Sequence, residues 1–306
     1  MAKLLLGIAV VLLACLELGS AYRLVCYFAN WAQYRPGAAK YTPDDIDPCM
    51  CTHLIFAFAV MKNNEVSTYG WNDVTLYKSF NALKTRTLDF FNLMTYDFYG
   101  PWNSFAGENS PLYALPNAQG NNKYFNMAGT VEVWKQEGAP AEKLNAGFAG
   151  YGHSFRLSTS NTAPGAPANG AGPAGHYTQQ SGFLAYFEIC LFLKEATEKW
   201  DASQMVPYAY KGNEWVGYDN PQSFEDKIKW LKKSQIGGAM MWTLSLDDFS
   251  GTFCHQGRYP LVSKLHNLLG INKGCVAPPL PTTPGIRTST INVLMDGHTW
   301  KIVTLD

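Results

Sequence analysis

Two residues that could do chemistry, Tyr96 and Asp97, stand together where an apolar run beginning at Phe90 ends. A phenol and a carboxylate can both hydrogen-bond a polar ligand. Gly100 and Pro101 then turn the chain away. A strand buried on both faces reads as nearly continuous hydrophobics, and in parallel α/β folds the ligand lies beyond the carboxyl ends of the strands. The pattern therefore predicts a buried strand that delivers a site, with a capped core strand as the alternative.

Composition narrows the kind of ligand. The chain has nine Trp, 17 Tyr and 17 Phe, which fits either a large core or a sugar-binding cleft, because flat aromatic faces stack on pyranose rings. Lys and Arg number 24, as do Asp and Glu. This balance gives no electrostatic steering toward nucleic acid or an anionic membrane, so we expect neither as a partner.

Apolar runs and their spacing predict the elements that must position the site. Buried strands are expected at Leu24–Trp31, Thr52–Val60, Phe90–Phe98, Ala146–Tyr151 and Gly238–Leu244. Helices are expected at Leu76–Arg86, Val131–Gln136, Phe224–Lys233 and Leu261–Leu269, with a short helix start at Tyr41–Ile46. Residues 158–177 are rich in Gly, Ala, Pro, Ser and Thr and predict an irregular segment, after which 206–218 reads as a hairpin.

The two ends of the chain have distinctive compositions. Lys3, an apolar run from Leu4 to Cys15 and small residues up to Ala21 predict a secretory signal peptide over residues 1–21, cleaved after Ala21. The run is too short to span a membrane, and no later segment approaches a span. We therefore expect a secreted, extracellular protein. Residues 276–306 begin with a Pro- and Thr-rich stretch, 276–290, and are expected to be a disordered tail.

Six cysteines remain after the predicted signal peptide: Cys26, Cys49, Cys51, Cys190, Cys254 and Cys275. An even count in an exported chain predicts three disulfides, although six cysteines allow fifteen pairings. The chain has no Cys-x-x-Cys pair, and its Cys-x-Cys has no His cluster nearby. We expect no metal and no cofactor.

The segment Met94-Thr95-Tyr96-Asp97, with Gly100 and Trp102, resembles the sixth-strand motif of glycoside hydrolase family 18, the chitinases and chitinase-like lectins. The resemblance runs from Tyr22 to Cys275, and the Ala-Phe-Ala that ends the second strand agrees with it. It implies an α/β fold, a (β/α)8 barrel with a small α+β insertion subdomain at 154–218. It also implies the disulfides Cys26–Cys51, Cys49–Cys275 and Cys190–Cys254.

The resemblance has one large gap. In the family, a third, fourth and fifth strand follow the second helix, and the fourth carries an Asp-Gly-x-Asp-x-Asp-x-Glu signature. Here Arg86 joins directly to Thr87 and the sixth-strand sequence. The implied barrel is therefore incomplete, with strands 3 to 5 missing. An exon-skipped transcript would give such a product.

The missing units include the catalytic acid. In the family mechanism a glutamic acid protonates the glycosidic oxygen while the acetamide of the sugar attacks its own anomeric carbon. Only the acetamide-orienting Tyr96 and Asp97 carry over. Other carboxylates (Glu108, Glu188, Asp247 and Asp248) are expected to be caps, turns or exposed groups. We therefore expect no catalytic residue and no enzymatic activity.

Sugar-contacting positions do survive by resemblance, namely Tyr27, Trp31, Phe58, Met94, Tyr96, Asp97, Trp102, Tyr151 and Trp242. They imply binding of chitin or chitooligosaccharides, with Trp242 as the floor under one sugar. Two alternatives are a chitinase that hydrolyses β-1,4 N-acetylglucosamine linkages and a nonfunctional splice product. Strand edges left without partners also predict self-association.

Overall fold

The computed structural model describes residues 22–47, 49–57, 60–62, 65–67, 90–136, 139–271, 291–296 and 299–304. Several sequence predictions lie outside these residues: the signal peptide, Phe58, the helix at 76–86, the join at 86–87, Cys275 and the segment 276–290. In the part that is described, no helix is long and apolar enough to cross a membrane.

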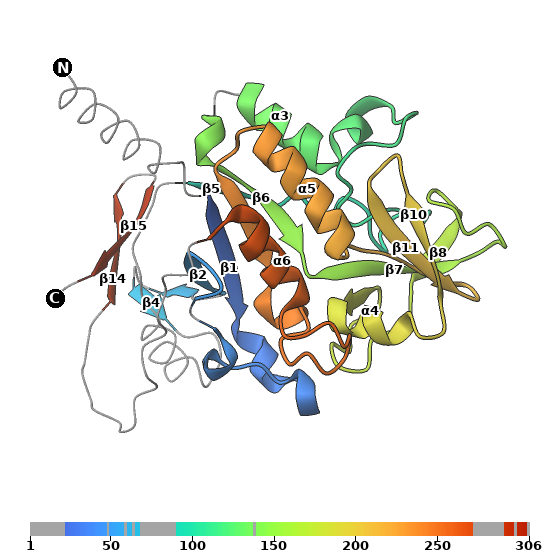
Figure 1. The fold of residues 1–306 in the computed structure, drawn as a ribbon, viewed down its shortest axis with the longest axis horizontal. Helices are drawn as coiled ribbons and strands as arrows, with labels where there is room; N and C mark the ends of the chain where they lie inside the picture. Colours follow the sequence, from blue (N-terminus) through green and yellow to red (C-terminus); the bar gives the residue numbers. More distant parts are fainter. Residues whose placement is uncertain are drawn as a thin grey trace, which may run out of the picture.

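A five-stranded parallel sheet forms the centre of the molecule (Figure 1). Its order is β2 (His53–Ala57), β1 (Arg23–Ala29), β13 (Gly238–Trp242), β6 (Leu144–Ala149) and β5 (Phe91–Leu93). The first strand of the chain lies beside the last parallel strand, as it does in an α/β barrel. Within the described chain the sheet is open, and β2 and β5 are its edges.

All five predicted strands are present. Four are shorter than expected, and β6 has the expected length but begins two residues earlier than predicted. The predicted strand Phe90–Phe98 pairs only over Phe91–Leu93, and residues 94–97 leave the sheet. The first strand ends at Ala29 and passes into a 3-10 helix at Asn30–Tyr34. The second ends at Ala57, and Val60 begins the short strand β3 (Val60–Lys62), which pairs with β4 (Glu65–Ser67). The polar and aromatic residues after these strands therefore lie outside the strand pairing.

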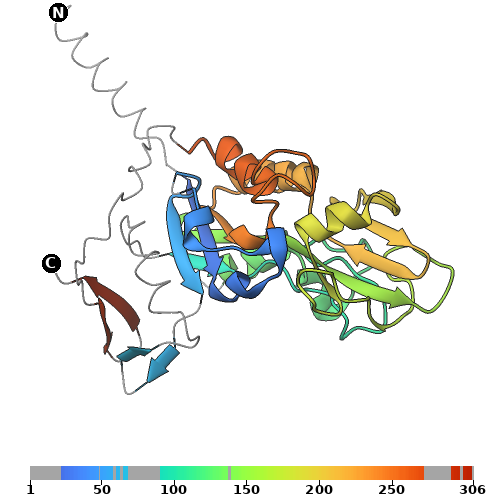
Figure 2. The ribbon, with the colours of Figure 1, turned by 90° about the horizontal axis from the view of Figure 1, so that it is seen from below.

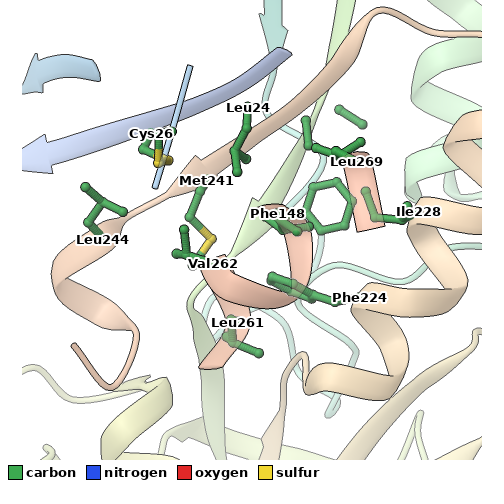
Figure 3. Close-up of a cluster of buried hydrophobic side chains, with 14 of the residues drawn as sticks. Leu24, Cys26, Phe148, Phe224, Ile228, Met241, Leu244, Leu261, Val262 and Leu269 are labelled. Atoms are coloured by element: carbon green, nitrogen blue, oxygen red, sulfur yellow. A yellow bond between two sulfur atoms is a disulfide. The ribbon is translucent and has the colours of Figure 1, made fainter. Parts of the chain in front are cut away.

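Alternate side chains of the sheet point to one face, which the helices cover. This helix-covered face includes Leu24, Cys26, Phe148 and Met241, packed with residues of α5 (Pro221–Lys233) and α6 (Pro260–Leu269) (Figure 3). Figure 2 shows both helices on the same side of the sheet. A third helix, α3 (Met127–Gln136), contacts β6. This arrangement buries the apolar positions that gave the strands their continuous hydrophobic pattern.

Both long helices begin at identifiable caps. The side chain of Asn220 accepts hydrogen bonds from Gln222 N and Ser223 N at the start of α5. The carboxylate of Asp247 accepts bonds from Leu261 N (3.0 Å) and Val262 N (2.9 Å) at the start of α6. Both helices then bury residues at helical spacing, so truncating one to Ala would cost about 2–5 kcal/mol.

The opposite face of the sheet, here called the inner face, carries a different set of side chains. Val25, Met240, Tyr96 and Tyr151 pack together there, with Tyr27 and Trp242 partly buried against them. Because successive strand residues point to opposite faces, Tyr27 and Trp242 must lie opposite the helices. The inner face is where the predicted site residues gather.

A second sheet, antiparallel, follows the parallel one (Figure 1, right). Its order is β10 (Thr197–Asp201), β11 (Val206–Lys211), β12 (Glu214–Gly217), β7 (Tyr151–Leu157) and β8 (Ala168–Ala171), and β9 (Phe183–Ala185) also pairs with β7. The predicted hairpin at 206–218 is confirmed as β11 and β12. The predicted irregular segment contains β8, and α4 (Tyr186–Phe192) follows β9.

Disulfides Cys26–Cys51 and Cys190–Cys254 are both present, which confirms two of the three implied pairings. The third involves Cys275 and lies outside the described residues. Within the segment predicted to be a tail, β14 (Ile291–Asp296) pairs with β15 (Thr299–Thr304), and the disordered tail at 276–306 stays a prediction.

Candidate functional site

The carboxylate of Asp97 lies at the centre of the candidate site. Its Oδ1 accepts a hydrogen bond from the Tyr151 hydroxyl at 2.5 Å and lies 2.9 Å from His153 Nε2. The backbone N–H of Asp97 donates to Asn109 Oδ1 at 3.0 Å. Asp97 has a φ of 61°, in the left-handed region that Asp tolerates better than most residues. This turn directs the carboxylate toward β7 instead of along the strand.

Both ring nitrogens of His153 lie within hydrogen-bond distance of an oxygen. The second ring nitrogen of His153, Nδ1, lies 3.0 Å from the carbonyl oxygen of Gly182, which can only accept. An ionised Asp97 also can only accept. His153 satisfies both partners when both ring nitrogens carry protons, so the geometry fits an imidazolium paired with a carboxylate.

The pKa values of the neighbouring groups agree with an ionised Asp97. Burial by itself would raise the pKa of Asp97, but the hydrogen bonds from His153 and Tyr151, with the charge of His153, give a net lowering. Burial, and then the charge of Asp97, raise the pKa of Tyr151. Tyr151 therefore keeps its proton and remains a donor. The Asp97 side chain is 50% exposed, and its second oxygen, Oδ2, accepts no hydrogen bond from the described residues.

Tyr96, the residue before Asp97, is buried on the inner face. Its ring lies 6.0 Å from that of Tyr151, and its hydroxyl lies 3.7 Å from Met240 Sδ. Burial raises the pKa of Tyr96. A Cβ at Gly147 would lie 2.7 Å from the Tyr96 ring, so the glycine lets this ring lie against β6. Tyr96 is only 6% exposed, so it can position Tyr151 by packing but offers little surface to a ligand.

Three predicted aromatic residues come together at the carboxyl ends of β1 and β13. The ring centroids of Tyr27 and Trp242 are 5.0 Å apart, and those of Trp31 and Trp242 are 6.3 Å apart. Asn92 on β5 donates to the Tyr27 hydroxyl at 3.3 Å. Trp31 is 42% exposed. The cluster offers aromatic faces at the same end of the sheet as Asp97.

Trp102 lies on the other side of Asp97, over the ring of His153. The two centroids are 5.0 Å apart in an edge-to-face arrangement, and Trp102 is 62% exposed. A Cβ at Gly100 would lie 2.3 Å from the indole, so glycine is needed for the ring to fold back there. Met94 is 72% exposed, and no ring contact or hydrogen bond ties its side chain to the cluster in the described chain.

A groove of about 330 Å³ opens beside Asp97, between the loop after β5 and α3. Phe98 and Phe125 are stacked along it with centroids 6.2 Å apart. Its lining is Asp97, Phe98, Tyr124, Phe125, Thr130, Val133 and Trp134. Asp97 is the one carboxylate in this lining, so a ligand in the groove would meet aromatic rings and a single negative charge.

The other carboxylates considered from the sequence are all buried. Glu188 accepts bonds from Tyr177 N, Thr178 and Ala185 N, and Asp247 caps α6. Asp248 accepts bonds from the loop 250–254. Glu108 is 1% exposed and has no hydrogen-bond partner among the described residues. Glu188, Asp247 and Asp248 confirm the expectation of caps and turns, and Glu108 contradicts it because it is buried without a partner. None of the four lines the groove beside Asp97.

Sequence reasoning missed His153 and Asn109 as parts of the site. A signal for His153 was present, because Tyr151 and His153 are two residues apart on one strand and must share a face. Asn109 gave no comparable signal. It lies in the loop after the turn and reaches both Asp97 N and Tyr151 O through the fold.

The fold and the site define a chitinase-type protein. The chain matches the Glycosyl hydrolases family 18 over residues 23–88 and 84–247, and it belongs to that family. Human chitinase-3-like protein 2 is 34% identical over 374 aligned positions, covering 85% of this chain and 96% of that protein. Oviduct-specific glycoprotein from Sus scrofa is 34% identical, covering 88% of this chain and 72% of that protein.

Solved structures give the same assignment. Human YKL-39, described as a pseudo-chitinase with retained chitooligosaccharide binding, is similar with a TM-score of 0.79 and 33% identity over 82% of this chain and 100% of that chain. An immunomodulatory active chitinase from Trichuris suis has a TM-score of 0.78 and 27% identity over 81% of this chain and 100% of that chain. The family thus includes relatives with and without activity.

Proposed function

We propose that this chain is a secreted chitinase-like protein that binds chitin or N-acetylglucosamine oligomers and does not hydrolyse them. The observation that carries the proposal is the state of Asp97. It is the one carboxylate in the groove lining, and His153 and Tyr151 hold it ionised. A carboxylate without a proton can bind an acetamide N–H or a hydroxyl, but it cannot act as a general acid.

The absence of a replacement acid supports the second half of the proposal. No Asp-x-Asp-x-Glu signature occurs in the sequence. The family match consists of two segments that meet at residues 84–88, where the sequence predicts the join between the second helix and the sixth strand. The alignment with chitinase-3-like protein 2 spans 374 positions although this chain has 306 residues. Both observations fit the loss of three strand-helix units.

The aromatic residues support the first half. Trp242, with Tyr27 and Trp31 around it, would stack on one sugar ring, and Trp102 would contact the chain beyond Asp97. YKL-39 binds chitooligosaccharides by its description. Tyr96, Met94 and Phe58 complete the proposed set, with Tyr96 acting through its packing against Tyr151. The second, antiparallel sheet would form one wall of this cleft, as the inserted subdomain does in the family.

Secretion and self-association belong to the same proposal. The predicted signal peptide and the disulfides Cys26–Cys51 and Cys190–Cys254 fit an oxidising compartment. The edge strand β5 has Phe91 45% exposed beside Trp134, with ring centroids 5.6 Å apart. An exposed apolar edge invites pairing with a second chain.

Activity and binding are tested separately. Purified protein should release no product from a fluorogenic chitobioside above a blank, because a positioned general acid typically contributes about 10²- to 10⁴-fold and its neighbours are missing as well. Turnover that disappears in Asp97→Asn would reject the non-enzymatic assignment and show that an acid acts at this site.

Binding is measured by titrating chitotriose against intrinsic tryptophan fluorescence. Trp242→Ala should abolish the change while leaving the circular dichroism spectrum intact. Trp200→Ala, on β10 at the far edge of the second sheet, is the matched control and should bind as the wild type does. Equal binding by the wild type and Trp242→Ala would place the ligand elsewhere and remove the main support for a lectin.

A further inference from the structure

The groove beside Asp97 continues along α3 as an exposed aromatic surface. Its lining includes Tyr124, Phe125 and Trp134, which are each at least 36% exposed. It reaches from Asp97, after the carboxyl end of β5, to Trp134, whose ring lies 5.6 Å from that of Phe91 at the start of β5. Single exposed aromatic residues are common, but several that line one groove indicate a binding surface. We call this surface the α3 groove.

The rings of the α3 groove are held in place by one another. Phe98 and Phe125 are stacked, and Tyr99 packs edge-to-face against Phe125 with the ring centroids 6.2 Å apart. A ligand would therefore meet aromatic faces that are already positioned. Because few side chains have to be ordered on binding, less conformational entropy is lost.

The polar groups of the α3 groove indicate which ligand it matches. In the described part of the chain, the Tyr124 hydroxyl and the Trp134 indole Nε1 make no hydrogen bond, so both can donate to a ligand. Asp97 is the one charged acceptor, with its side chain 50% exposed and its Oδ2 free. The groove therefore fits an apolar ligand with hydrogen-bond acceptors along its length and a cation at one end.

Neighbouring charges place that cation at Asp97. Lys123 Nζ lies 4.7 Å from the centroid of the Tyr124 ring, so a second positive charge is disfavoured there. Lys135 on α3 is paired with Glu132 at 3.7 Å, so this pair adds no net charge beside the groove. The carboxylate of Asp97 is ionised, and it attracts a cation at its free oxygen.

The sequence of this chain contains a segment with these properties. Pro278, Pro281, Pro284 and Arg287 recur at every third position, and a polyproline II helix has three residues per turn. In that conformation the three prolines and the arginine share one face. Proline supplies a carbonyl acceptor but no N–H donor. Proline-rich segments dock in aromatic grooves in this conformation, because it is preformed and loses little entropy. The segment lies outside the described residues.

We propose that the α3 groove binds residues 278–287 of a second copy of this chain as a polyproline II helix. Pro281 and Pro284 pack on the aromatic rings, where their carbonyls can accept from the tyrosine hydroxyl and the indole N–H. Arg287 pairs with Asp97 Oδ2. Proline stacking and the ion pair thus match the two parts of the groove.

The path of the chain favours a second copy over the same copy. Asp247 follows the carboxyl end of β13 and caps the first turn of α6, so this helix begins at the end of the sheet where Asp97 lies. α6 packs on β1 and β13 and carries the chain about 15 Å back toward the amino ends of the strands. The chain therefore leaves Leu269 at the opposite end of the sheet from Asp97. This assignment rests on the self-association proposed above, whereas binding of the segment in the groove does not.

The test is fluorescence anisotropy with a labelled synthetic peptide of residues 276–288. The acceptor is the full chain carrying Pro281→Ala, Pro284→Ala and Arg287→Glu, so that its own segment leaves the groove free. The peptide should bind this acceptor saturably. A peptide with Arg287→Ala should bind about 1.5- to 5-fold more weakly, the range expected for one exposed ion pair. A peptide with Pro281→Ala and Pro284→Ala should also bind more weakly.

The location is tested by further substitutions in the acceptor. Trp134→Ala should abolish saturable binding, and Tyr113→Ala is the matched control, because Tyr113 is a 42% exposed aromatic outside the lining. Asp97→Asn should make the wild-type and Arg287→Ala peptides bind alike, since the charge that distinguishes them is gone. Should Trp134→Ala fail to give a native circular dichroism spectrum, Val133→Lys adds a positive charge to the groove wall and should weaken binding of the wild-type peptide.

Three results with the peptide would overturn the proposal: no saturable binding, binding that survives Trp134→Ala, and equal affinity for the wild-type and Arg287→Ala peptides. The second copy is tested by sedimentation of the full chain at micromolar concentration. The acceptor variant should self-associate less than the wild type. A wild type that binds the peptide but stays monomeric, or an acceptor variant that self-associates equally, would overturn the assignment to a second copy. Pairing of β5 edges is tested separately, because Phe91→Lys leaves the proline-rich segment unchanged.

Discussion

Replacing Glu108 by Gln should stabilise the protein at neutral pH. Glu108 is 1% exposed, and neither carboxylate oxygen has a hydrogen-bond partner among the described residues. Burial raises the pKa of Glu108 well above its ordinary value, the charges of Asp201 and Asp219 raise it further, and the charge of Lys227 opposes them. Lys227 is occupied elsewhere, because it forms a fully buried ion pair with Asp219 at 2.5 Å. Glu108 therefore folds as the neutral acid.

The sign and size of the effect follow from proton linkage. The pKa of the Glu108 carboxyl is higher in the folded protein than its ordinary value of 4.5, which we take for the unfolded chain. Its contribution to the free energy of unfolding is therefore complete below pH 4.5 and is lost as the pH rises toward the folded pKa. Because the folded and unfolded states differ by at most one bound proton at this residue, the free energy of unfolding falls by no more than about 1.4 kcal/mol per pH unit. Between pH 4.5 and pH 7 the wild type can therefore lose at most roughly 3 kcal/mol through this residue. Gln at position 108 cannot ionise and removes the loss.

The assay is urea unfolding, followed by tryptophan fluorescence at several fixed pH values between 4.5 and 8. We expect the free energies of unfolding of Glu108→Gln and wild type to be similar at pH 4.5 and to diverge as pH rises, with the variant more stable. Glu142→Gln, at an exposed position, is the matched control and should show no such divergence. A difference independent of pH, or a variant less stable at pH 7, would refute the assignment of a neutral Glu108.

Three further predictions concern the site, the disulfides and the sheet edge. His153→Leu should raise the pKa of Asp97, because it removes a hydrogen bond and a charge that lower it; an NMR titration of the Asp97 carboxyl showing no rise would contradict the ion pair. Cys190→Ala with Cys254→Ala should lower the free energy of unfolding in urea by about 2–4 kcal/mol, because the bridge closes a loop of 64 residues in the unfolded chain. An unchanged midpoint would contradict this contribution of the bridge. In sedimentation at micromolar concentration the wild type should self-associate, and Phe91→Lys should reduce this self-association because it places a charge on the exposed edge. A monodisperse monomeric wild type would argue against an open edge at β5.

The amino-acid sequence by itself determined the strands of the parallel sheet, the helices α5 and α6, the hairpin of β11 and β12, and the family. These features depend on local patterns of burial and turns, or on short motifs such as Tyr96-Asp97 followed by Gly100 and Trp102. Two disulfide pairings came from the resemblance, because six cysteines alone leave the pairing open.

Only the tertiary structure decided how the site is built. The bond between Asp97 and His153 joins residues 56 apart, and it requires a left-handed backbone at Asp97 that no local pattern specifies. The burial of Glu108 likewise depends on how its loop after β5 packs against β12. A sequence records which side chains a strand carries on each face, but the partner of each polar atom is set by elements that meet only when the chain folds.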